Sequence, residues 1–248
     1  MLVEVDFPLY AVSDEGTGNV LVAAEEVEGF FVDPEEEPTE VAFLRAHELN
    51  KGRRRTEDAV LEIMNRRQEK IGEYFIGRVV LGDTGQESPD GKISRVPYQY
   101  FGNRCEYPGA EKIWQRWATG ATLHKGEWLQ WPVSYQSAWL HVVQNSWFAS
   151  NHGSAQVGVD CVAHLDGTNI STRSGFFCAL GEAVNGPGGY FGSNLDALAD
   201  CIASRFTKGS TVKIVWKDFD TSRELLSDAF LDSVMGVIRE SRVDITVC

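Results

Sequence analysis

In the C-terminal part of the chain, short apolar runs alternate with segments of helical periodicity. The runs are CVAHL, TVKIVW and VDITVC, and each has the length of a short β-strand. Between them, apolar residues recur at i, i+3 and i+7, as in Phe177, Leu180 and Val184, with Ser174 as the expected N-cap of that helix. Strands that alternate with helices predict an α/β fold, in which helices pack on a small parallel sheet.

The N-terminal part contains segments with the patterns of strands and segments with the periodicity of helices. FPLYAVSD, NVLVAAEEVEGFFVD and GEYFIGRVVLGD favour strands. Residues 53–71 are predicted to form a helix, because Ala59, Ile63 and Met64 fall on one side of a helical wheel and Thr56 is placed to cap it. PGAEKIWQRWATG and SAWLHVVQNSWF predict two further helices. We therefore expect an α+β N-terminal domain.

Tryptophan is concentrated at the end of this N-terminal part. Six of the seven tryptophans fall between Trp114 and Trp147. Such a cluster could bind a ligand by stacking, but a core or a seam between domains is favoured, because buried aromatic rings dominate both. The small, polar stretch ASNHGSAQVG follows, and we place the domain boundary there. The expected domains are residues 1–153 and 154–248.

Charge and cysteine usage narrow the function classes. A formal net charge of -13 argues against nucleic acid or an anionic membrane surface as a direct partner. No apolar run is long enough to span a bilayer, and the start of the chain does not resemble a signal peptide. The five cysteines are scattered without a CxxC pair, which predicts neither disulfides nor a zinc site and favours the reducing cytoplasm. No cofactor or metal is expected.

The stretch YFGSNLDALADC, residues 190–201, reads as a tight loop that leads into a helix. Asn194 is a strong N-cap type, and Asp196 falls in the first turn, where the helix dipole favours an anion. The wheel places Leu198 and Ile202 on the buried side together with the first residue, Leu195.

Asp196 and Asp200 fall nearly opposite that side, next to each other and with no basic residue near them along the helix. A like-charge pair at i, i+4 costs about 0.2–0.5 kcal/mol. This spacing leaves two interpretations open: a small cost that is tolerated, or an anionic surface that faces a cationic site on another molecule.

The segment GGYFGSNLDALADCIAS resembles the signature of the barstar family, intracellular inhibitors of the ribonuclease barnase. VAHLDGTNI, VKIVWKDFDTSRELL and VIRESRVDITV resemble the strands and last helix of the same family in the same order. The resemblance covers about residues 157–248 and almost none of the first 150. It implies a barstar-like three-stranded parallel sheet with packed helices, and it implies that the acidic helix and the preceding loop plug the active site of a ribonuclease.

The resemblance also implies which residues contact the partner. They are Tyr190, Gly192, Asn194, Leu195, Asp196, Asp200 and Glu240. Asp200 would take the place of a substrate phosphate among the cationic groups of a basic, extracellular or toxin-type ribonuclease. Ala199 departs from the family, whose best-known member has Trp there, so one apolar contact is missing. Neither the role of residues 1–153 nor self-association follows from the resemblance.

Two alternatives of other classes remain. A barstar-like domain could serve as a docking module without a nuclease target. An enzyme could instead use Asp196 and Asp200 as an acid/base pair or metal site. Against an enzyme, both aspartates lie on an open helix face, with no histidine, cysteine or third carboxylate at ligand spacing. We therefore expect a binding protein and not an enzyme.

Overall fold

The computed structural model describes residues 6–33, 40–85, 88–89, 91–152, 161–207, 211–241 and 243–248, and at 206 and 207 it describes the backbone alone. The chain divides into two compact units, Met1–Ala121 and Thr122–Cys248. The boundary expected at 153/154 lies outside the described residues. The division into units places the preceding helix, α2 (Gln136–Ala149), in the same unit as the C-terminal strands.

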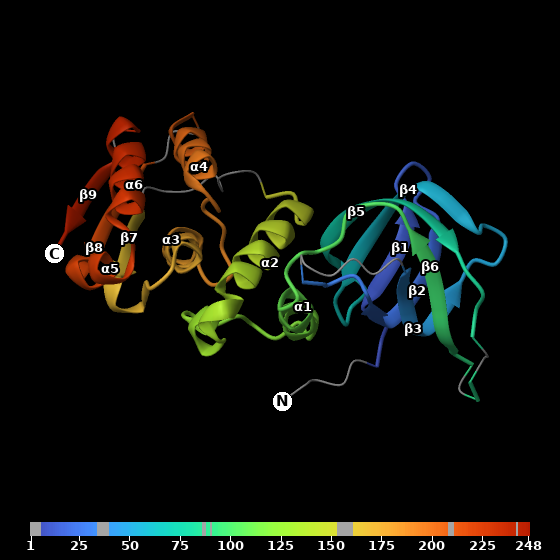
Figure 1. The fold of residues 1–248 in the computed structure, drawn as a ribbon. Helices are drawn as coiled ribbons and strands as arrows, with labels where there is room; N and C mark the ends of the chain where they lie inside the picture. Colours follow the sequence, from blue (N-terminus) through green and yellow to red (C-terminus); the bar gives the residue numbers. More distant parts are fainter. Residues whose placement is uncertain are drawn as a thin grey trace. The chain divides into compact units, whose positions relative to one another are not determined.

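The first unit is a closed β-barrel in which the strands follow the order β1-β2-β3-β6-β5-β4 (Figure 1). Its strands are β1 (Tyr10–Asp14), β2 (Val20–Glu28), β3 (Glu40–Leu49), β4 (Arg55–Met64), β5 (Lys70–Leu81) and β6 (Ile93–Tyr100). All neighbouring pairs are antiparallel, and β1 closes the barrel by pairing with both β2 and β4. The strands expected in FPLYAVSD, NVLVAAEEVEGFFVD and GEYFIGRVVLGD are confirmed by β1, β2 and β5.

The helix predicted for residues 53–71 is wrong, because most of this segment is β4. β4 lies between β1 and β5 and pairs with both. Its pairing with β5 is irregular around Ala59 and again before Met64, and such bulges interrupt the strict alternation that would reveal a strand. Thr56 is not a helix cap, since its hydroxyl donates a hydrogen bond to the buried Asp14 on β1.

The helix predicted in PGAEKIWQRWATG is confirmed as α1 (Ala110–Ala118), which also belongs to the first unit. Trp114 is fully buried, and its indole N–H donates a 2.8 Å hydrogen bond to the Tyr74 hydroxyl of β5. A core role is thereby confirmed for this tryptophan. The six clustered tryptophans do not form one group, however, because Trp114 and Trp117 lie in the first unit and the other four in the second.

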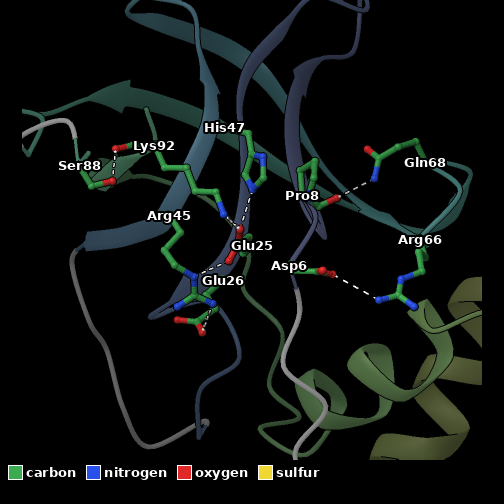
Figure 2. A network of polar contacts seen from close by, with 10 residues as sticks. All are labelled: Asp6, Pro8, Glu25, Glu26, Arg45, His47, Arg66, Gln68, Ser88 and Lys92. Atoms are coloured by element: carbon green, nitrogen blue, oxygen red, sulfur yellow. Dashed lines mark hydrogen bonds and ion pairs between the residues drawn. The ribbon is translucent and has the colours of Figure 1, made fainter. Parts of the chain in front are cut away.

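A buried carboxylate joins two neighbouring barrel strands (Figure 2). Glu25 of β2 accepts a hydrogen bond from the Arg45 guanidinium of β3. Its Oε1 also lies 2.7 Å from the His47 ring nitrogen of β3 and 2.5 Å from the Lys92 ammonium just before β6. Burial raises the pKa of Glu25, but the hydrogen bonds from Arg45, Lys92 and His47 outweigh it and lower this pKa to about 2.

The second unit contains a three-stranded parallel sheet in the order β7-β8-β9 (Figure 1). Its described elements are η1 (Glu127–Gln130), η2 (Val133–Tyr135), α2, β7 (Cys161–Asp166), η3 (Gly167–Asn169), α3 (Arg173–Asn185), α4 (Leu195–Thr207), β8 (Val212–Lys217), α5 (Phe219–Leu225), α6 (Asp228–Glu240) and β9 (Asp244–Val247). The predicted parallel sheet with packed helices is therefore confirmed.

Helices cover one face of this sheet. On β8, Ile214 and Trp216 are fully buried while the alternate residues Lys213 and Lys217 are exposed, so TVKIVW is buried on one side only. The Trp216 ring stacks on Phe176 of α3 at 5.1 Å between ring centroids. These rings form the centre of the core on which α3 is held.

The start of α3 differs from the prediction. Thr172, and not Ser174, is the N-cap, since its hydroxyl oxygen accepts a 2.9 Å hydrogen bond from the Gly175 amide. The same hydroxyl donates a hydrogen bond to the Gln136 side chain, at the start of α2. The N-cap is therefore at Thr172 and not at Ser174 because Thr172 combines a local cap with a tertiary contact to α2.

Candidate functional site

The acidic helix α4 is built as its sequence predicts. The Asn194 side-chain oxygen accepts a 2.8 Å hydrogen bond from the Ala197 amide, and the Asn194 carbonyl accepts one from Leu198. Leu198 and Ile202 are fully buried, while Leu195 is half-buried at the first turn. The capped first turn and the buried side fix the orientation of the helix.

Asp196 and Asp200 are both exposed, as the wheel predicts. Within the described segments, neither carboxylate takes part in an ion pair, although acidic and basic side chains pair at many places elsewhere in the chain. The two carboxylates stand one turn apart, so each lies in the field of the other. The fold therefore holds two like charges side by side and in contact with solvent.

The loop before α4 is pressed against that helix at Gly192. Its backbone has φ +96°, in the left-handed region that strongly favours glycine. A Cβ at this position would lie 2.9 Å from both the Cα and the N of Leu198. These are backbone atoms of α4, which cannot rotate away. Glycine is thus required for the loop to pack this closely beside the acidic helix.

Tyr190 lies in the same loop but is buried, with 3% of its surface exposed. Its carbonyl accepts a 2.6 Å hydrogen bond from the Asn185 side chain at the end of α3, and its hydroxyl lies 3.4 Å from the Ser193 hydroxyl. Burial raises the pKa of the Tyr190 phenol, and the negative charge of Asp200 adds to this rise. Tyr190 therefore fixes the loop beside Asp200 and presents little side-chain surface to a partner.

Glu240 is the last residue of α6 and is exposed. α6 packs against α4, so Glu240 stands on the helix that adjoins the acidic one. Of the residues expected in the site, Asn194, Asp196, Asp200 and Glu240 are thus exposed, Leu195 is half-buried, and Tyr190 and Gly192 are buried.

Residues outside the expected site support its loop from α2. The Phe148 ring packs on the Tyr190 ring, with centroids 5.4 Å apart and planes at 63°. At the other end of α2, the Cys178 thiol of α3 donates to the Gln136 carbonyl. The sequence contained one signal for this role: in SAWLHVVQNSWF the residues Trp139, Val142, Val143 and Trp147 fall on one helical stripe, which is typical of a helix packed against other elements.

Glu182 of α3 ties a further segment to this framework. Both of its carboxylate oxygens accept the Gly126 amide at 2.9 Å, just before η1. Burial raises the pKa of Glu182, and the Gly126 hydrogen bond partly opposes this rise. The segment from Thr122 to the end of α2 therefore packs on α3 as part of the unit that carries α4.

The chemistry available beside Asp200 is limited. The neighbouring Cys201 is buried, and burial together with the charge of Asp200 raises the pKa of its thiol to about 12. This thiol is therefore protonated at neutral pH and is not a nucleophile there. In the described part of the chain, no three His, Cys, Asp or Glu side chains are grouped to hold a metal ion. None of the described helices combines the length and the apolar character needed to cross a membrane.

The C-terminal segment matches a known family. Residues 161–245 match the family model described as Barstar (barnase inhibitor); this match runs from β7 into β9 and includes α4. No family model matches the N-terminal part of the chain, and no curated protein matches the chain. α2 lies before the matched residues, although it belongs to the same compact unit.

Proposed function

We propose that the Barstar-family domain of this chain inhibits a barnase-like ribonuclease by docking α4 and its preceding loop into the nuclease active site. The observation that carries the proposal is the pair Asp196 and Asp200, two exposed carboxylates on a capped helix. The family described as barnase inhibitors is an inhibitor family and not a family of enzymes. An acidic pair of this kind fits a protein whose active site binds the phosphates of RNA.

Asp200 is the proposed centre of the contact. Its carboxylate would stand where a substrate phosphate binds, among the cationic groups of a basic nuclease of the extracellular or toxin type. Asn194, Leu195 and Asp196 would surround it, with Gly192 holding the loop and Glu240 contributing at the edge. In the free protein, the packing of the buried face of α4 already orients the carboxylates toward solvent. Less conformational entropy is therefore lost when the partner binds.

The proposed setting is the cytoplasm, where an inhibitor would protect the cell from such a nuclease. All five cysteines are free thiols, as a reducing compartment requires. The formal net charge of -13 would speed association with a basic partner, and salt would screen this attraction.

Asp200→Ala tests the proposal. The full chain is titrated against purified barnase, and both the cleavage of an RNA substrate and the binding kinetics are measured. We expect binding to weaken by ~2–5 kcal/mol or more, which is roughly thirty- to several-thousand-fold, because this is the usual cost of removing one partner of a buried, hydrogen-bonded charge pair at an interface. The melting temperature should stay the same or rise slightly, because the change relieves repulsion by Asp196.

Asp220→Ala is the matched control. It removes the same charge from an exposed helical aspartate, but on α5 instead of α4. Inhibition by this variant should stay within about twofold of the wild type, since an exposed charge outside the contact affects mainly the association rate. If Asp200→Ala inhibits barnase as well as the wild type does, α4 is not the inhibitory surface. If the wild type does not bind barnase, a docking module with another target becomes the better reading.

A further inference from the structure

Phe148 is an exposed aromatic side chain on a helix that is otherwise largely buried. The buried residues of α2 are Gln136, Ala138, Trp139, Leu140, Val142, Val143 and Trp147. Phe148, one residue from the end of the helix, is 47% exposed. Among the described large hydrophobic side chains of the second unit that are exposed, it is the only aromatic one.

The position of Phe148 links it to the acidic helix. Its ring packs edge-on against Tyr190, whose hydroxyl lies 3.4 Å from Ser193. The next residue in the chain is Asn194, which caps α4. Phe148 thus packs on the loop that leads into the first turn of α4, the helix that carries Asp196 and Asp200.

Because Tyr190 is buried, its ring contact with Phe148 bears on which side chain a partner would touch. The resemblance to the inhibitor family assigns Tyr190 to the interface, yet only 3% of its surface is exposed. Phe148 covers part of the Tyr190 ring and keeps about half of its own surface in water. A partner that approaches this part of the loop would therefore meet the ring of Phe148.

We propose that Phe148 is an aromatic contact residue for the same ribonuclease, so that α2 extends the docking surface beyond the Barstar-family segment. This inference rests on the proposed function. The partner is inferred from charge complementarity. Asp196 and Asp200 are expected to contact a cationic site on the ribonuclease, and an apolar group beside that site excludes water from the charge pairs. Aromatic residues are enriched at protein interfaces for this reason among others. Phe148 thereby supplies apolar contact area that Ala199 lacks.

Binding of barnase by full-length variants tests the inference through separate rate constants. Phe148→Ala should raise the dissociation rate roughly tenfold, because truncation of an interface aromatic is felt mainly after docking. Its association rate and the salt dependence of that rate should match the wild type, since no charge changes. Phe148→Tyr keeps the ring and should restore slow dissociation. Leu225→Ala, at an exposed residue on α5, is the control and should dissociate like the wild type.

A second pair of variants separates an interface role from a role in packing Tyr190. Phe148→Lys and Leu225→Lys alter the net charge equally, both at exposed positions. If Phe148 faces the basic partner, Phe148→Lys should slow association several-fold more than Leu225→Lys, because the new cation meets like charge at the interface. A loss of packing alone would not produce this difference.

The outcomes distinguish this inference from the proposed function. If Asp200→Ala abolishes inhibition while Phe148→Ala dissociates like the wild type and the two lysine variants associate equally, the role of Phe148 is refuted and the inhibitory function stands. If wild-type protein does not bind barnase, both proposals fail.

Discussion

Gly192→Ala should destabilise the second unit and displace the loop that positions the acidic helix. An alanine at φ +96° is strained, since left-handed backbone costs L-residues about 1–2 kcal/mol. Its Cβ would also stand 2.9 Å from two backbone atoms of Leu198, and overpacking of this kind costs about 1–3 kcal/mol. We expect the free energy of unfolding to fall by about 2–5 kcal/mol.

Gly236→Ala is the matched control within the same unit. Gly236 lies inside α6, and a Cβ there would meet no atom within 4 Å. The same substitution should therefore raise the stability by about 0.5–1 kcal/mol, because alanine loses less backbone freedom than glycine when a helix forms. The two glycine-to-alanine changes thus have opposite expected signs, although they are identical in chemistry.

Urea unfolding followed by tryptophan fluorescence provides the assay. Five of the seven tryptophans belong to the second unit, so its transition dominates the signal. Inhibition of barnase is measured alongside, and Gly192→Ala should weaken it, because the loop and the start of α4 shift together. A Gly192→Ala variant that unfolds at the wild-type urea concentration would refute the close approach of the loop to α4.

Two further predictions concern the unit boundary and the barrel. A fragment of residues 122–248 should unfold cooperatively when it is heated. A fragment of residues 155–248 should have a much lower thermal stability, because it loses the contacts of Gln136 with α3 and of Phe148 with the loop. Equal thermal stability of the two fragments would show that α2 is dispensable. The pKa of Glu25 is lowered from 4.5 to about 2, so its contribution to barrel stability should be complete above pH 4.5 and should be lost as the pH falls toward 2. In Glu25→Gln, the stability of the barrel should depend less on pH between these two values. A pH profile of stability that is the same as in the wild type would contradict the role of this carboxylate.

Several features were determined by local sequence alone. The alternation of strands and helices from Cys161 onward, the Asn194 cap and the exposure of Asp196 and Asp200 all follow from patterns within one element. Periodicity fixes which side of a helix is apolar, and a cap residue fixes where the helix starts, without reference to distant residues. For this reason the cap, the buried Leu198 and Ile202 and the two exposed aspartates were predicted correctly, whereas Leu195, placed on the buried side, is only half-buried.

Other features were decided only by tertiary structure. Residues 55–64 form a strand because β1 and β5 pair with them from both sides, which outweighs the helical pattern of their apolar residues. Tyr190 packs against Phe148, which is distant in sequence, and α2 contacts α3 through Gln136. Strand pairing and burial depend on residues far along the chain, and the spacing of apolar residues within a short segment contains no information about those residues.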